Sequence, residues 1–117
     1  MISTKLKQFF SRFRSKPSKI EIPIKNWEGE DGKGKLYVEL EGEELAFLEY
    51  SNVRGKVLTL HHTEVSDKLR GKGVGKLLIE EAVAMARTQN LKIMPMCPYA
   101  KTVFTKNQDL RDVLKGW

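Results

Sequence analysis

The chain has 117 residues and a formal net charge of +6, with 40% hydrophobic and 31% charged residues. This length and composition predict one globular domain with a modest core, and no run approaches the roughly 18 apolar residues of a membrane span. A single cysteine allows no disulfide within these residues, which favours a reducing compartment and a cytoplasmic protein. One cysteine and two histidines are also a poor set of metal ligands, so we expect no metal site.

Residues 1–19 differ in charge from the rest of the chain. Six basic residues and no acidic residue lie there, so the remainder is electrically neutral. Apolar side chains share one face of a predicted helix, which Pro17 ends: Ile2, Leu6, Phe9, Phe10 and Phe13. We expect a basic amphipathic extension that self-associates or packs on the domain. Contact with an anionic membrane surface, or organellar targeting in a eukaryote, are the alternatives. Because the domain is neutral, nucleic-acid binding by the domain is disfavoured.

The next part of the chain is predicted to form hairpins. Apolar residues at every second position predict three strands, over 20–24, 36–40 and 45–50. A polar, glycine-containing stretch over 26–34 is expected to be a loop, and residues 41–44 a tight turn. Consecutive hairpins indicate an antiparallel sheet. Trp27 is assigned to core packing and Trp117 to packing of the tail.

A strand, a glycine turn and a helix follow one another in the central part of the sequence. The strand is predicted over 57–65 and the helix over 74–88, where apolar residues recur at helical spacing. The turn contains three glycines, Gly71, Gly73 and Gly75. Because they have no Cβ, the backbone of the turn can approach a ligand closely. Free N–H groups at the start of the helix attract anions. Arg70 and Lys72 add positive charge. The pattern predicts a phosphate-bearing ligand held mainly by main chain.

Two common phosphate-binding patterns do not match this turn. A Walker A loop requires Gly where Arg70 stands and Ser or Thr where Leu77 stands. A dinucleotide fingerprint requires a third Gly where Lys76 stands, and an acidic residue about 20 positions further on. The stretch 87–93 contains no acidic residue.

The remaining pattern is Arg-x-x-Gly-x-Gly at Arg70, Gly73 and Gly75, which resembles the acyl-CoA-binding turn of the GNAT superfamily of N-acyltransferases. Together with His62-Thr63-Glu64-Val65 and Cys97-x-Tyr99, it makes the chain similar to small single-domain GNAT-like proteins of the YjdJ type, over roughly residues 20 to 115. The resemblance implies an α+β fold in a domain of residues 20–117. The expected sheet is mostly antiparallel, with a central, splayed, parallel strand pair and helices packed on it.

The resemblance also implies an activity, namely transfer of an acyl group from an acyl-CoA to an unidentified amine. Acetyl-CoA is the expected donor. Backbone amides of the turn would bind the pyrophosphate of coenzyme A, and the preceding strand would pair with the pantetheine arm. The implied cofactor-binding residues are Val65, Arg70, Gly71, Lys72, Gly73, Val74 and Gly75. A non-catalytic CoA-binding sensor or partner-binding module is an alternative. A basic-armed nucleic-acid or membrane binder with a purely structural turn is another.

The full GNAT fold normally has two helices between its first two strands, and residues 20–56 leave no room for them. These helices wall the acceptor pocket in larger relatives. The resemblance therefore implies that the acceptor side of this protein is open, or is completed by the extension or a second subunit.

The C-terminal part predicts one more strand and two short helices. Asn90 suits the end of the long helix, and residues 91–96 form a strand parallel to 57–65. Pro95 cannot donate to a ladder, so it marks where pairing stops. This position fits the opening between the two splayed strands of the GNAT fold, and an ordinary edge position would also explain it. Short helices are expected over 99–104 and from Asn107 to Gly116.

Four residues are candidates for catalysis of amide formation. Period-two geometry places His62 and Glu64 on one face of their strand and His61 on the other. Either His62 or Glu64 could deprotonate the acceptor ammonium. The alternatives are a hydrogen-bonded core histidine and a solvated or ion-paired glutamate.

Cys97 and Tyr99 are the other two candidates, on the expected leaving-group side. In one version Cys97 accepts the acyl group covalently, with His62 raising its thiolate fraction. In the other, Cys97 lines the pocket and Tyr99 protonates the leaving thiolate. Cys97 as a buried packing group is the default interpretation.

Overall fold

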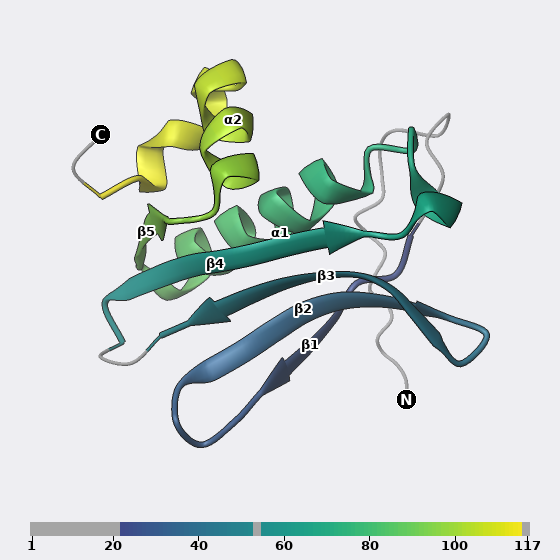
Figure 1. Cartoon of the computed structure of the whole chain (residues 1–117). Helices are drawn as coiled ribbons and strands as arrows, with labels where there is room; N and C mark the ends of the chain where they lie inside the picture. The colour runs from purple at the N-terminus through teal and green to yellow at the C-terminus, as the bar shows by residue number, and fades with distance from the viewer. Residues whose placement is uncertain (1–21, 53–54, 116–117) are drawn as a thin grey trace.

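The computed structural model describes residues 22–52 and 55–115. The predicted extension of residues 1–19, the first two residues of the predicted strand 20–24, Gly116 and Trp117 lie outside these ranges. Five strands form one sheet, and the helices pack on it (Figure 1). Within these ranges, no helix is both long and apolar enough to cross a membrane.

The strands lie in the sheet in the order in which they occur in the chain. They are β1 (Lys25–Glu28), β2 (Lys33–Leu40), β3 (Glu43–Ser51), β4 (Val57–Val65) and β5 (Lys92–Pro95). Neighbours from β1 to β4 are antiparallel, whereas β4 and β5 are parallel. The predicted sheet, mostly antiparallel with one parallel pair, is confirmed. The helical elements are η2 (Asp67–Leu69), α1 (Val74–Gln89), α2 (Pro98–Lys106) and η3 (Gln108–Val113).

The first strand was predicted in the wrong place. Ile22 and Ile24 are partly buried against the core but belong to no strand, and β1 occupies residues assigned to the loop 26–34. β2 likewise begins at Lys33, inside that predicted loop. Ile22 and Ile24 are partly buried from an irregular segment, while β1 is an exposed edge strand without an alternating apolar pattern. Hydrophobic periodicity therefore could not identify β1.

Trp27 is exposed, which overturns its assignment to the core. Its side chain is 57% exposed. Asn26 and Glu28, its two neighbours in β1, instead approach the hydroxyl of the buried Tyr50, at 2.5 Å (Asn26 Oδ1) and 3.1 Å (Glu28 Oε2). Since strand side chains alternate between faces, these contacts place Trp27 on the opposite face of the sheet.

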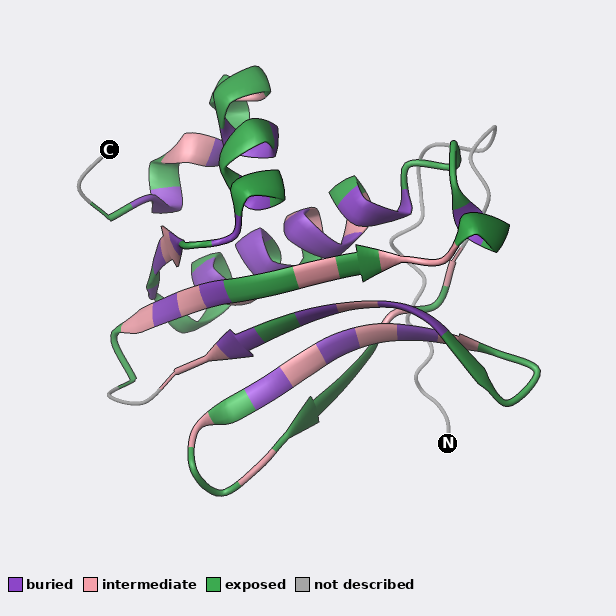
Figure 2. Cartoon of the chain, in the orientation of Figure 1, coloured by how far each residue is buried: buried purple, intermediate pink, exposed green. Residues whose placement is uncertain are grey.

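One face of the sheet packs against α1, and no element of the described residues covers the other face, the open face (Figure 2). Alternate residues of β2, β3 and β4 are completely buried against the apolar face of α1: Leu36, Val38, Leu48, Leu58 and Leu60 meet Leu78, Ile79, Ala82 and Val83. The intervening residues are half-buried or exposed. In the described parts of residues 22–56 the chain forms strands and turns and no helix.

A β-bulge changes the direction of side chains in β4. Leu60 pairs with Tyr50 and His62 with Glu49, which leaves His61 as an extra residue opposite β3. His61 Nε2 lies 2.8 Å from Ser51 Oγ, and the His62 ring lies 5.8 Å from the Phe47 ring. Both imidazoles therefore face the open side of the sheet. The prediction that His61 and His62 face opposite sides was wrong, because strict alternation does not hold across a bulge.

The C-terminal elements largely follow the prediction. Asn90 ends α1 in the left-handed conformation, with φ 59°, and its N–H bonds to carbonyls of the last turn. Pro95 is the last residue of β5, and pairing with β4 stops at Leu60 and Pro95. The final helix is a 3-10 helix, η3, that follows α2 directly.

Tyr50 should make stability depend on pH in the alkaline range. Burial, and then the negative charge of Glu28, raise the pKa of Tyr50 to about 12, above the roughly 10 of an unfolded tyrosine. The unfolded chain therefore loses this proton first, so the stabilisation is complete below pH 10 and is lost as pH rises to 12. Urea denaturation should show that Tyr50→Phe weakens this decline and lowers stability by about 1 kcal/mol. Tyr37→Phe, on the open face, is the control; an equal change in both variants would contradict the assignment.

Candidate functional site

A cavity of about 370 Å³ lies where β4 ends and α1 begins. It is enclosed by the end of β4, η2, the glycine turn and the start of α2. The lining residues are Thr63, Val65, Leu69, Arg70, Gly71, Gly73, Val74, Gly75 and Tyr99. Six of the seven residues predicted to bind the cofactor line this cavity. Lys72 lies in the same exposed turn without lining the cavity.

The glycine turn presents open backbone to the cavity. Gly71 and Gly73 adopt φ of 78° and 73°, in the left-handed region that side chains with a Cβ rarely occupy. A Cβ at either glycine would have nothing within 4 Å. Gly73 is the N-cap of α1 and supplies no side chain to the first N–H groups of the helix. The positive end of the α1 dipole therefore opens towards the cavity.

Arg70 is paired with a neighbouring carboxylate. Its Nε donates to Asp67 Oδ1 at 2.6 Å, and both side chains are largely exposed. An ion pair at such an exposed position is weak, so an incoming anion could compete with Asp67 for the guanidinium.

The first turns of α1 and α2 meet at Gly75 and Tyr99. A Cβ at Gly75 would lie 2.6 Å from the hydroxyl oxygen of Tyr99 and 2.8 Å from its Cζ. The phenol thus rests on the bare backbone of α1 at the wall of the cavity. Burial, and then the charge of Cys97, raise the pKa of Tyr99. Tyr99 therefore keeps its proton at neutral pH and is a potential proton donor.

Cys97 lies behind the cavity wall. It is 3% exposed, and its Sγ lies 3.5 Å from Oγ1 of Thr63, which does line the cavity. Cys97 is also the N-cap residue of α2, which begins with Pro98 at its first position. The thiol is placed as a packing group beside the site.

His62 and Glu64 form a pair on the open face. His62 Nε2 lies 2.8 Å from Glu64 Oε2, and their side chains are 53% and 64% exposed. The prediction that they share a face is confirmed by this contact. The structure does not bring His62 and Cys97 together, because Thr63, the contact of Cys97, faces the cavity on the other side of β4.

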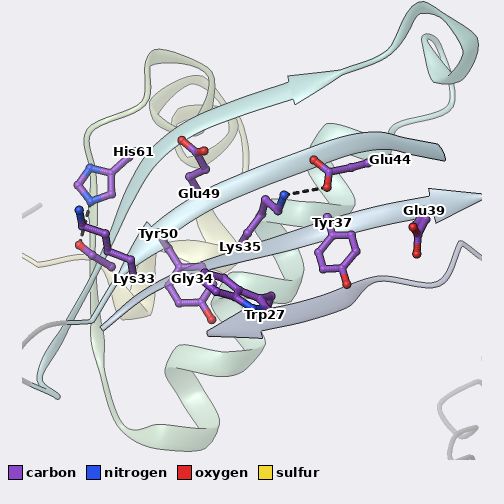
Figure 3. Close-up of a pocket in the computed structure, with 11 residues that line it drawn as sticks. Trp27, Lys33, Gly34, Lys35, Tyr37, Glu39, Glu44, Glu49, Tyr50 and His61 are labelled. Atoms are coloured by element: carbon purple, nitrogen blue, oxygen red, sulfur yellow. Dashed lines mark hydrogen bonds and ion pairs between the residues drawn. The ribbon is translucent and has the colours of Figure 1, made fainter. Parts of the chain in front are cut away.

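A larger groove of about 970 Å³ lies on the open face of the sheet (Figure 3). Its lining residues come from all four antiparallel strands: Trp27, Lys33, Gly34, Lys35, Tyr37, Glu39, Glu44, Glu49, Tyr50, Ser51 and His61. Sequence reasoning missed this groove because β1 was assigned to a loop and His61 to the other face. The alternation of Lys35, Tyr37 and Glu39 with buried residues was the available signal.

Metal ligands are not clustered in the described part of the chain. No group of three His, Cys, Asp or Glu side chains within residues 22–52 and 55–115 could hold a metal ion.

Comparison with known proteins identifies the family. Residues 35–113 match the model of the GCN5-related N-acetyl-transferase family, and the chain therefore belongs to this family. A GCN5-like candidate N-acetyltransferase from Staphylococcus aureus is similar at 38% identity, with a TM-score of 0.63, over 82% of this chain and 90% of that one.

More distant structures share the fold. Ribosomal-protein-alanine N-acetyltransferase from Brucella melitensis is 20% identical over 64% of this chain, with a TM-score of 0.54. Ribosomal-protein-S18-alanine N-acetyltransferase from Escherichia coli is 17% identical over 68% of this chain, with a TM-score of 0.55. The matches span 60% and 53% of the length of these two proteins.

The contact between Gly75 and Tyr99 can be tested by stability measurements. Gly75→Ala should force the Tyr99 ring to move and lower the free energy of unfolding by about 1–3 kcal/mol. In a Tyr99→Ala background the same substitution should cost nothing further, because the ring is gone. Urea denaturation of the four proteins gives this double-mutant cycle. An equal loss from Gly75→Ala in both backgrounds would show that the ring does not lie there.

Proposed function

We propose that this protein is an acyl-CoA-dependent N-acetyltransferase that moves an acetyl group from acetyl-CoA to an amine. The observation that carries the proposal is the cavity at the start of α1, lined by left-handed glycines, in a member of the GCN5-related N-acetyl-transferase family. The sheet has five strands, and the motifs His62-Thr63-Glu64-Val65, Arg70 to Gly75 and Cys97-x-Tyr99 follow one another in the sequence. These features further suggest the small single-domain YjdJ-type group.

The coenzyme A pyrophosphate is proposed to sit on the amides of Gly73, Val74 and Gly75. These groups open the helix without a capping side chain, so an anion can satisfy them. Lys72 and Arg70 add positive charge from the turn. The 370 Å³ cavity then receives the pantetheine arm.

The unpaired edge of β4 is the proposed partner of the pantetheine amides. β4 is paired with β3 as far as Val65, but its pairing with β5 stops at Leu60. Within residues 22–52 and 55–115, no strand pairs with the main chain from His61 to Val65 on its other side. An extended amide-bearing arm can pair with this edge as an added strand would, which supports the role assigned to Val65.

The chemistry is proposed to take place at this same edge, with donor and acceptor arriving from opposite faces. The acceptor ammonium loses a proton to His62 or Glu64 on the open face. The amine nitrogen then attacks the thioester carbonyl, and it loses its second proton to solvent as the C–S bond breaks. The coenzyme A thiolate takes a proton from Tyr99, which solvent then reprotonates. Thr63 forms part of the wall on the donor side, and Cys97 packs behind it.

Coenzyme A binding should stabilise the protein measurably. Ligand at 100 times its dissociation constant adds about 2.7 kcal/mol to the free energy of unfolding, visible as a rise in Tm. Gly73→Ala places a Cβ in the proposed phosphate site and should weaken binding about tenfold or more in calorimetry. Gly42→Ala is the matched control, because Gly42 has a φ of 81° and equally open surroundings in a remote turn. Absence of binding by the unaltered protein, or equal weakening by both variants, would refute the proposed site.

Direct transfer and covalent transfer make different predictions for Cys97 and Tyr99. The buried position of Cys97, away from His62, favours direct transfer. Cys97→Ala should therefore keep kcat within about twofold while lowering stability by about 1 kcal/mol, because a small cavity forms. Tyr99→Phe should lower kcat by about 10- to 100-fold, since the proton donor is lost. Release of the coenzyme A thiol measures kcat, and mass spectrometry detects acetylation of Cys97. An acetylated Cys97 that passes its acetyl group to an amine would establish covalent transfer instead.

A further inference from the structure

Four residues form one straight row across the open face of the sheet. Trp27 of β1 pairs with Lys35 of β2, Lys35 with Glu49 of β3, and Glu49 with His62 of β4. The row therefore leads from the outermost strand to the proposed general base. The groove of about 970 Å³ extends over the same face and is lined by the first three of these residues (Figure 3).

Glu49, in the middle of this row, has no cationic partner within residues 22–52 and 55–115. Lys35, although directly opposite, turns to Glu44, with Nζ 2.7 Å from Oε1, and lies over the rings of Tyr37 and Phe47. Among the described residues Glu49 forms no ion pair. An exposed carboxylate beside His62 can therefore receive an ammonium group that arrives at the base.

Trp27 gives the far end of the row an exposed aromatic surface. More than half of its side chain is open to solvent on the groove side. Large exposed aromatic rings at the edge of a groove are typical of surfaces that anchor an apolar side chain of a partner.

The row sets the length of a ligand that contacts both ends. Three spacings between neighbouring strands, each about 4.8 Å, separate β1 from β4 by about 14 Å. An extended polypeptide covers this distance in about four residues, at about 3.3 Å per residue. A small amine placed at His62 cannot reach Trp27, and would leave most of the groove empty.

We propose that the groove is the acceptor site, and that the acceptor is a polypeptide amine. The chain crosses the strands along the row, presents an ammonium group to Glu49 and His62, and rests an apolar side chain about four residues away on Trp27. This inference rests on the proposed function, since it names the acceptor class of that site.

The test uses capped glycine peptides that carry one lysine as their sole amine. A phenylalanine is placed one to five residues from the lysine, and butylamine represents the lysine side chain alone. With the full chain and acetyl-CoA, kcat/KM should be highest when the separation is about four residues. That peptide should exceed the peptide without phenylalanine by about fivefold, the size of one aromatic contact, and butylamine by about tenfold or more.

Variants connect this preference to the row. Trp27→Ala should abolish the advantage of the well-placed phenylalanine, and Trp27→Phe should restore most of it. Glu49→Gln should raise KM for every peptide by about two- to fivefold with kcat unchanged, as expected for one exposed ion pair. Glu41→Gln, in the turn after β2 and outside the groove, is the control and should match the unaltered protein. Coenzyme A affinity and Tm should be the same in all four variants.

The outcomes separate this inference from the function on which it rests. If the unaltered protein does not bind coenzyme A, the proposed function fails. If it binds coenzyme A and acetylates at least one tested amine, two results each overturn the acceptor site alone: butylamine or spermidine acetylated as efficiently as the best peptide, or no effect of phenylalanine position. Coenzyme A binding with no acetylation of any tested amine would overturn the proposed function. The acceptor site is also overturned if Trp27→Ala leaves the preference for the well-placed phenylalanine intact.

Discussion

The end of pairing between β4 and β5 is the constraint on which the site depends. β5 ends at Pro95, and directly after it the amides of Met96 and Cys97 both donate to the carbonyl of Leu60, at 2.9 and 3.1 Å. The chain then leaves the sheet as α2 instead of extending the ladder. This departure exposes one edge of β4 beyond Leu60 and brings Tyr99 against the first turn of α1. The cavity is the space that results.

The two faces of β4 carry different kinds of side chain because of the bulge at His61. Before the bulge, Leu58 and Leu60 are buried against α1. After it, Thr63 and Val65 face the cavity, whereas His62 and Glu64 face open solvent. An acyl donor and an acceptor that approach from opposite faces would meet only at the unpaired edge. This arrangement separates the start of α1, the proposed phosphate site, from the carboxylates of the open face, which would repel a phosphate.

Local sequence predicted the parts of the fold that depend on local interactions. The turn from Arg70 to Gly75, the start of α1 and its end at Asn90 follow from glycine conformation and helix capping, and all were predictable. β1 was not predictable, because Tyr50, more than twenty residues away, holds Asn26 and Glu28. The orientation of His61 depends on register between strands, which alternation within one strand does not determine. Tertiary contacts determine both the position of β1 and the orientation of His61.

The same distinction explains why residues that line the cavity at the start of α1 could be predicted and the groove on the open face could not. Arg70, Gly71, Gly73, Val74 and Gly75 lie in one turn, so a single motif contains most of the cavity lining. The proposed acceptor row takes one residue from each of four strands, Trp27, Lys35, Glu49 and His62, so no single motif contains it. A substitution at Trp27 or Glu49 would leave every recognisable motif intact. Members of the family could therefore keep the donor turn and still differ in acceptor, since the row can change without disturbing the motif.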